Sequence, residues 1–312
     1  MTTTAERPIP APPPPPPPPD AGGPERPVIR EPLPRRIVRA LSHGPLHVVL
    51  IVIALAWLTP TLGLFVSSLR SVTENSESGW WRALTDWRTL SLENYRSILD
   101  NDRIVEALRN TVLITVPATL GVVFIASLAA YAFAWIDFKG RDWYFVAVVA
   151  LLVVPIQVAL IPVASLYGDL GIYGDLSGVV LFHIAFGLPF AVFLLRNFFA
   201  GIPRELLEAA RIDGAGEFKV FRMVVLPIGL PAIASLAIFQ FLWTWNDLLV
   251  GLVFADETNA PITVAIRNQT RQFGTNIDII APAAFLSMIV PLLVFFAFQR
   301  YFVQGLLAGS ER

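Results

Sequence analysis

A few polar side chains interrupt the long apolar runs of this chain, and they are the groups that could do chemistry there. An ionisable residue inside a membrane-length apolar run is energetically expensive, so it is a candidate functional residue by default. His183 and Asp247 are of this kind, and Gln157, Gln240 and Asn246 are polar neighbours in similar runs. Such groups could contact a polar ligand within the membrane.

Each of these residues also has an ordinary structural explanation. For His183 we favour a hydrogen bond to a facing helix over contact with a ligand. Asp247 lies late in its apolar run, where water could hydrate it. Tryptophan is common at membrane interfaces, although indole rings could also stack on a sugar ring. The candidate substrate-pathway residues are His183, Gln240, Trp243, Trp245, Asn246 and Asp247.

Recognisable catalytic motifs are absent from the sequence. It contains no H-E-x-x-H or G-x-S-x-G pattern, and no G-x-x-x-x-G-K-[ST] loop to cradle phosphates. Cysteine is also absent, which removes thiolate nucleophiles and the usual soft metal sites. The formal net charge of -1 gives no basic field for nucleic acid. We therefore predict a non-catalytic protein that holds no metal or cofactor of its own and binds no nucleic acid.

The composition indicates an integral membrane protein. Hydrophobic residues make up 55% of the 312-residue chain and charged residues only 15%, with a mean hydropathy of +0.62. A helix needs about 20 mainly apolar residues to cross the hydrocarbon of a bilayer. Six segments that lack Asp, Glu, Lys and Arg meet this length: Val48 to Leu69, Thr111 to Ile136, Trp143 to Gly168, Leu176 to Leu195, Met223 to Asn246 and Ile279 to Gln299.

The predicted fold class is therefore all-α, with six transmembrane helices surrounded by membrane lipid. Prolines within the spans, such as Pro155 and Pro189, predict kinked helices, because neighbouring helices can satisfy the backbone groups that proline frees. The fifth span could continue past Asp247 to about Ala255.

The first 45 residues differ in kind from the remainder. Pro12 to Pro19 is an unbroken proline run, which favours an extended polyproline II conformation. We interpret residues 1–45 as a disordered tether in preference to a ligand for a proline-reading module, and residues 46–312 as the membrane domain. No signal peptide is expected, because prolines occupy the place of an apolar leader segment.

Lys and Arg indicate the orientation of the spans, because they gather on the cytoplasmic side. With the N-terminus inside, the inner segments carry Arg35, Arg36, Arg39, Lys139, Arg141 and five basic residues between Arg196 and Arg222. The long loop after the first span weakens this count with six arginines, although long loops contribute less. We therefore predict that both termini are cytoplasmic and that the protein lies in a bacterial-type plasma membrane.

The segment Glu208 to Pro227, EAARIDGAGEFKVFRMVVLP, lies on the inner side between the fourth and fifth spans. Pro203 fits the first turn of a helix, and Gly214 can take the positive φ that ends it. Glu217 then starts a second helix that runs into the fifth span. From the residues alone, this segment is either an interfacial loop anchored to the inner leaflet or a docking surface for another protein.

The spacing within this segment resembles a known motif. Glu208-Ala209-Ala210, three residues, Gly214, nine residues, Val224, one residue and Leu226-Pro227 resemble the EAA loop of permease subunits in binding-protein-dependent ABC importers, in which isoleucine usually stands where Val224 does. Further stretches resemble the smaller permease of the maltose-type carbohydrate importers: Ser91 to Tyr95 before Asn110-Thr111, Leu195 to Phe199 before Ile202-Pro203, Trp245-Asn246-Asp247, and Gln304-Gly305.

The resemblance implies a type I permease fold that forms the pathway for a mono-, di- or oligosaccharide together with a second, homologous permease. It implies that the loop, about 197–226, is a coupling helix that docks onto a cytoplasmic ABC ATPase dimer, which would use the ATP and Mg. Carried over by position, the docking residues are Glu208, Ala209, Ala210, Asp213 and Gly214, and motion passes through Leu226 and Pro227. Gly214→Asp is accordingly expected to abolish uptake without preventing membrane insertion.

The polar loop from Ala255 to Ile280 is the predicted contact for an extracytoplasmic substrate-binding protein, with Arg267, Asn268 and Gln269 as candidates. Two other functions remain open from the residues alone. An ion-coupled secondary transporter of a small polar solute would also use kinked helices and scattered polar groups, but its uptake would be insensitive to vanadate. A purely structural membrane subunit would move no solute.

Overall fold

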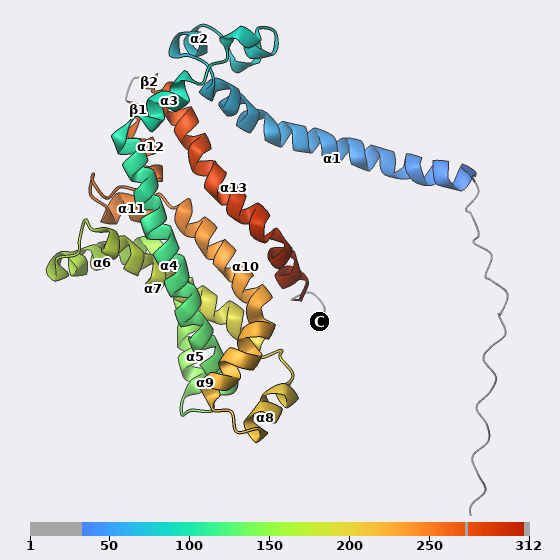
Figure 1. The fold of residues 1–312 in the computed structure, drawn as a ribbon, viewed down its shortest axis with the longest axis vertical. Coiled ribbons are helices and arrows are strands. Elements are labelled where there is room, and N and C mark those ends of the chain that lie inside the picture. The colour runs from blue at the N-terminus through green and yellow to red at the C-terminus, as the bar shows by residue number, and fades with distance from the viewer. Residues whose placement is uncertain (1–32, 272–273, 309–312) are drawn as a thin grey trace, which may run out of the picture. The chain divides into compact units, whose positions relative to one another are not determined.

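The computed structural model describes residues 33–271 and 274–308 and is built almost entirely of helices (Figure 1). Short 3-10 turns occur at Trp80–Leu84, Trp87–Thr89 and Leu151–Val153, and a π-helical turn at Phe221–Val225. Strands β1 (Thr270–Arg271) and β2 (Gly274–Thr275) form a two-residue antiparallel hairpin. The α-helices are α1 (Leu33–Ser68), α2 (Val72–Glu77), α3 (Glu93–Leu99), α4 (Asp102–Trp135), α5 (Arg141–Ala150), α6 (Ile156–Leu170), α7 (Leu176–Phe199), α8 (Arg204–Ile212), α9 (Glu217–Val220), α10 (Leu226–Trp245), α11 (Leu249–Phe254), α12 (Ile262–Asn268) and α13 (Ile277–Ala308).

Five helical segments in the described part of the chain are long and apolar enough to cross a membrane. They are Pro45–Ser68, Asp102–Trp135, Leu176–Phe199, Glu217–Trp245 and Ile277–Gln299, and they correspond to five of the six predicted spans. The remaining prediction, Trp143 to Gly168, is a bent pair in which α5 with its 3-10 turn meets α6 at 101°. The described part of the chain has six candidate spans if this pair counts as one.

Pro155 explains the position of this bend. It precedes the first residue of α6 and cannot donate the backbone hydrogen bond that would continue α5. Val154 before it is extended, with φ -70° and ψ 116°, as residues that precede proline usually are. The sequence predicted a kink here, and the structure has a complete break.

The fifth span ends within one residue of the predicted Asn246. α10 stops at Trp245, and α11 is a separate helix that begins at Leu249, so the proposed continuation to Ala255 is wrong. Asp247 caps α11, because its Oδ2 accepts hydrogen bonds from the backbone N–H groups of Val250 (2.9 Å) and Gly251 (3.3 Å). A side chain chosen as a pathway residue therefore also has a structural task.

The predicted boundary of the N-terminal tail is placed too late in the chain. α1 begins at Leu33, so residues 33–45 belong to a helix and not to the tether. Residues 1–32, which include the proline run, lie outside the described residues. By its contacts the chain divides into residues 1–58 and residues 59–312, and the second unit contains helices α2 to α13.

Helices α4, α7 and α10 form the core of this second unit. Ala118, Val122, Ala126 and Ala130 of α4 recur every fourth residue and are completely buried. Such a stripe of small side chains lets neighbouring helices approach closely. α7 matches it with Gly187, where an added Cβ would lie 2.8 Å from Gln240 Oε1 of α10 and 3.0 Å from Val122.

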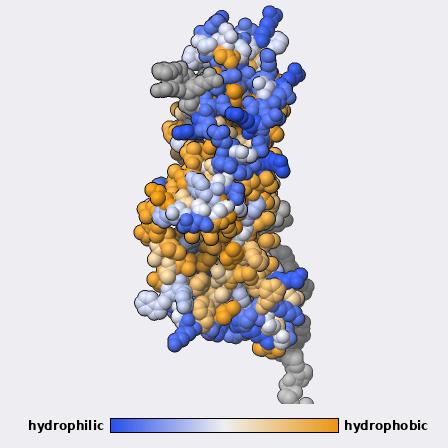
Figure 2. All heavy atoms as spheres, turned by 90° about the vertical axis from the view of Figure 1, so that its left-hand side faces the viewer, coloured by the Kyte–Doolittle hydropathy of each residue, from blue (hydrophilic) through white to orange (hydrophobic). Residues whose placement is uncertain are grey.

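Apolar side chains cover the middle of the face shown in Figure 2, and hydrophilic residues gather at its two ends. Leu120 and Phe124 of α4 are large apolar residues that face outward, both more than 60% exposed. Lipid is the natural neighbour of such residues, because only the interior of the bundle needs protein partners. α8 and α9 lie at one end, opposite α3 and α12 (Figure 1).

Candidate functional site

The predicted docking segment folds as a short helix, a turn and a second helix. α8 buries Leu207 completely in the core, whereas Glu208, Ala209, Asp213 and Gly214 are exposed and Ala210 is half-buried. Ile212 at its end is 85% exposed. Pro203 is the N-cap residue of α8, so it lies just before the first turn and not within it. α8 thus has one face fixed in the protein and one free face that carries the motif residues.

Gly214 forms the corner as predicted. Its φ is 80°, a left-handed conformation that only glycine adopts without strain. Its N–H donates to the carbonyl of Arg211, and the N–H of Ala215 donates to that of Ala210, both at 3.0 Å. These two bonds make a Schellman motif, which satisfies carbonyls left over at the end of α8.

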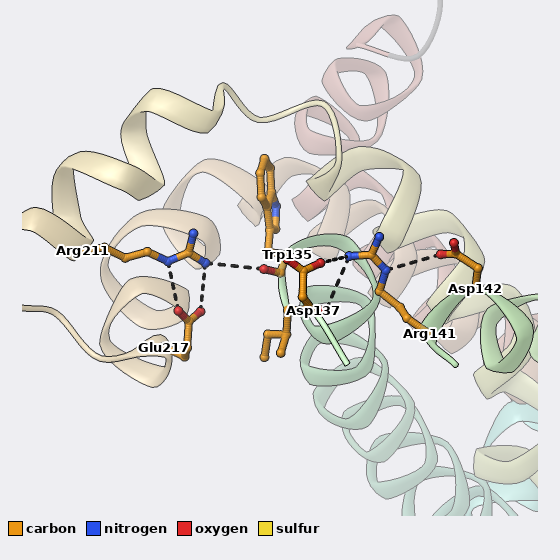
Figure 3. Close-up of polar contacts among 7 residues, drawn as sticks. Trp135, Asp137, Arg141, Asp142, Arg211 and Glu217 are labelled. Atoms are coloured by element: carbon orange, nitrogen blue, oxygen red, sulfur yellow. Dashed lines mark hydrogen bonds and ion pairs between the residues drawn. The ribbon is translucent and has the colours of Figure 1, made fainter. Parts of the chain in front are cut away.

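A polar network joins this turn to the end of α4 (Figure 3). The Arg211 guanidinium binds Glu217 at two points, Nε to Oε1 at 3.0 Å and Nη2 to Oε2 at 3.2 Å. Tyr131 of α4 donates its hydroxyl to Glu217 Oε2 at 2.5 Å, and Arg211 Nη2 also lies 3.5 Å from the carbonyl of Trp135. The hydrogen bond that Arg211 donates to the Glu217 carboxylate raises the pKa of Arg211 above its ordinary value.

The same end of α4 has a second arginine. Arg141, at the start of α5, donates to Asp137 Oδ1 at 2.8 Å and lies 3.5 Å from the carbonyl of Ile136 (Figure 3). The last carbonyls of a helix lack partners within it and carry partial negative charge, which favours cations there. The end of α4 is therefore met by one arginine from α8 and another from α5. This network was not predictable from the sequence, because Tyr131 and Glu217 are 86 residues apart in the chain.

The path from the turn into α10 passes through the widened turn Phe221–Val225, in which the N–H of Leu226 donates to the carbonyl of Phe221. Pro227 follows directly and lacks the N–H that would continue the ordinary helical ladder. Leu226 is half-buried against the core, and Pro227 is exposed. Both residues therefore occupy the junction between the turn and the fifth span.

Three of the predicted pathway residues line one cavity of about 490 Å³ between the α5–α6 break, α7 and α10. His183 and Gln240 are buried, each 4% exposed, and Trp243 is 55% exposed. Gln240 donates its amide to the hydroxyl of Thr244 at 3.1 Å. The remaining lining is mostly apolar and includes Leu151, Ile156 and Phe186. The cavity thus combines one imidazole, one amide and one indole with apolar walls.

His183 faces Asp247 as well as this cavity. The distance from His183 Nε2 to Asp247 Oδ2 is 3.8 Å, which is too long for a hydrogen bond, so Asp247 is not the partner that a bond to a facing helix would need. A second space of only about 10 Å³ lies beside both residues and is lined by Thr115, whose buried hydroxyl has no partner among the described residues. A space of this size holds about one water molecule.

Trp245 and Asn246 are not among the residues that line the cavity. Trp245 is 1% exposed and donates its indole N–H to the carbonyl of Ser287 in α13 at 3.0 Å. Asn246 is exposed and donates to the carbonyl of Leu242 at 2.8 Å, closing the end of α10. The contacts of both side chains are those of residues that hold helices in place.

The predicted binding-protein residues lie at the end of the unit opposite α8. Arg267 and Asn268 are exposed at the end of α12, whereas Gln269 is half-buried and accepts a hydrogen bond from Asn276. Asn110 of α4 donates to the carbonyls of Thr258 (2.8 Å) and Ala260 (3.3 Å) in the segment before α12. The Asn110-Thr111 pair therefore fastens this segment, since Thr111 also accepts the N–H of Ile262 at 2.8 Å.

Comparison with known proteins identifies a family match over residues 115–307, to the family described as the inner membrane component of binding-protein-dependent transport systems. The match begins within α4 and covers more than half of the chain. It includes the docking segment, the cavity residues and the segment that contains α12.

Individual relatives agree with this match. The chain is 47% identical over 275 residues to an osmoprotective compounds uptake permease of Synechocystis, covering 86% of this chain and 92% of that protein. It is also 47% identical over 229 residues to an alpha-glucoside transport system permease of Rhizobium meliloti, covering 71% of this chain and 60% of that protein. A solved bacterial ABC transporter involved in alginate import has the same fold, with a TM-score of 0.69, 21% identity and coverage of 85% of this chain and 98% of that one.

Proposed function

Because the chain belongs to the family of inner membrane components of binding-protein-dependent transport systems, we propose that it is a permease subunit of an ATP-driven sugar importer. The alpha-glucoside permease among its relatives supports a sugar as the transported solute. A mono-, di- or oligosaccharide would arrive from an extracytoplasmic binding protein and pass between this chain and a second, homologous permease.

The free face of α8 is the observation that carries the proposal. Ile212 is 85% exposed at the end of a helix whose opposite side, Leu207, is completely buried. An apolar side chain presented in this way beside exposed Glu208 and Ala209 suits a partner surface with a complementary groove. We assign that surface to an ABC ATPase dimer, which would bind and hydrolyse ATP with Mg while this chain stays non-catalytic.

The topology of the proposal follows the distribution of basic residues. α8 and α9 carry Arg204, Arg211 and Lys219 and would face the cytoplasm, with both chain termini on the same side. The α12 end would then face outward, where Arg267, Asn268 and Gln269 are available to the binding protein. The cavity with His183, Gln240 and Trp243 supplies hydrogen-bonding groups and one exposed indole, the kinds of group that bind sugar hydroxyls and stack on sugar rings.

The test is purification of the membrane complex through a tag on this chain, followed by reconstitution into proteoliposomes with the binding protein. A radiolabelled panel of trehalose, maltose and sucrose measures uptake. We expect an ATPase to co-purify and uptake to require ATP and to stop with vanadate. Uptake that ignores vanadate but collapses when an ion gradient is dissipated would instead establish a secondary transporter.

Two matched variants test the docking surface itself. Ile212→Glu is expected to lose the co-purifying ATPase while the protein still inserts. Leu84→Glu is the control, because Leu84 is similarly exposed, at 76%, but lies outside the docking segment. Loss of the ATPase from both variants, or from neither, would contradict the assignment of α8.

A further inference from the structure

The network at the end of α4 has a geometry that a simple surface ion pair does not need. The Glu217 carboxylate accepts hydrogen bonds from Nε and Nη2 of Arg211 and from the hydroxyl of Tyr131. Tyr131 is only 4% exposed. Two-point arginine–carboxylate pairs fix orientation as well as distance. One carboxylate therefore holds together α8, α9 and α4.

Packing beneath the network joins the same elements. The ring of Tyr131 lies 5.3 Å from that of Phe221, and Leu207 of α8 belongs to the same buried cluster. Trp135, one helical turn after Tyr131, donates its indole N–H to the carbonyl of Phe199 at the end of α7 at 2.9 Å. The end of α4 is thus in contact with α7, α8 and α9 together.

Stability alone is a weak explanation for the Arg211–Glu217 pair. Its side chains are 31% and 46% exposed, and ion pairs at such positions contribute little to folding. The position of the pair is more informative, because no loop joins α4 directly to α8. The pair therefore gives movement of α8 a direct polar route to α4, beside the apolar packing of Leu207 in the core.

We propose that Arg211, Glu217 and Tyr131 form a clamp that transmits the movement of α8 directly to α4. This inference rests on the proposed function, in which the ATPase moves α8. Movement then enters the bundle along two routes, through the chain into α10 and through the clamp into α4. Glu217 is a positioning residue in this scheme, since it touches neither the ATPase surface of α8 nor the cavity.

A distance measurement on the complex tests the clamp. The chain contains no cysteine, so Glu205→Cys on α8 and Lys139→Cys just after α4 accept spin labels at two defined sites. With the clamp intact, the label-to-label distance stays the same in the nucleotide-free complex and after trapping with ATP and vanadate. With Glu217→Gln or Tyr131→Phe, we expect the distance to change or its distribution to broaden on trapping.

Uptake of the radiolabelled panel per ATP hydrolysed gives a second readout. Glu217→Gln and Tyr131→Phe should retain the ATPase but lower this ratio about fivefold or more. The exchange Arg211→Glu with Glu217→Arg should recover part of it. Asp137→Asn is the control, because it breaks a 2.8 Å ion pair at the same end of α4 that does not reach α8.

An unchanged distance and an unchanged ratio in Glu217→Gln or in Tyr131→Phe would overturn the clamp. Tyr131→Phe removes a single hydroxyl and preserves the ring contact with Phe221, so it keeps the test open if a charge variant fails to fold. Failure of the proposed function would look different, because the unaltered protein would then co-purify with no ATPase.

Discussion

Gly214 offers a quantitative test of the turn that presents α8. Its φ of 80° is strained for any residue with a Cβ, yet nothing lies within 4 Å of the place where a Cβ would be. The cost of a substitution is therefore conformational and not steric. For alanine the left-handed conformation costs about 1–2 kcal/mol, which lowers the population of the docking-competent turn by a factor of about 5–30.

Different side chains at this position separate backbone strain from charge. Asparagine tolerates the left-handed region better than alanine does, so Gly214→Asn should have the smaller effect. Aspartate has a similar backbone tolerance but adds a negative charge at the C-terminal end of α8, which the helix dipole disfavours. The population of the docking-competent turn should fall less in Gly214→Asn than in Gly214→Ala. Gly214→Asp should lower it more than Gly214→Asn does, and its charge alone makes that difference.

The assay is the affinity of the purified permease for the proposed ATPase, followed by ATP-dependent uptake. Gly216→Ala is a matched control two residues away, because Gly216 has equally open surroundings but a φ of -70°, which any residue adopts. It should bind like the unaltered protein. Equal losses in Gly216→Ala and Gly214→Ala, or no loss in either, would refute the reasoning from the positive φ.

Three further substitutions test the packing around the site. Trp245→Phe removes the hydrogen bond to the Ser287 carbonyl and should lower the free energy of unfolding in detergent by about 1 kcal/mol. Gly187→Ala forces a Cβ to 2.8 Å from Gln240 Oε1, and the overpacking should cost roughly 1–3 kcal/mol in the same assay. Asn110→Ala frees the segment before α12, so its amides should exchange hydrogen faster while those of α10 do not, and equal exchange in both proteins would show that Asn110 does not fasten it.

Local structure was the part of this fold that the sequence predicted well. Runs without charge located the long spans, because length and hydropathy are properties of each segment alone. The positive φ of Gly214 was predictable for the same reason, since it depends on helix termination and on the absence of a Cβ. The break at Pro155 was located correctly but its size was not, because a bend of 101° depends on the helices that pack around it.

Contacts between distant segments could not be predicted in this way. His183 and Asp247 were selected from the sequence as polar residues in apolar runs, but their separation of 3.8 Å depends on how α7 meets the start of α11. Trp245 was selected as an aromatic residue that could stack on sugar, and the structure buries it against α13. Tyr131 was missed because a tyrosine at the end of an apolar span is typical of a membrane interface and gives no sign of its partner.

The two routes from α8 into the bundle differ in stiffness. The route through the chain crosses the turn at Gly214 and the widened helical turn before Pro227, and both lack the regular hydrogen-bond ladder that makes a helix rigid. The clamp route crosses neither, because Glu217 joins Arg211 to a tyrosine that is buried in the core. Since α4 packs along its buried stripe against α7 and α10, a displacement delivered by either route spreads through this packed core, but the clamp delivers it to α4 without crossing the two irregular turns. The clamp route therefore reaches the packed core, and with it the cavity wall that contains His183 and Gln240, without first crossing a segment that lacks the regular helical ladder.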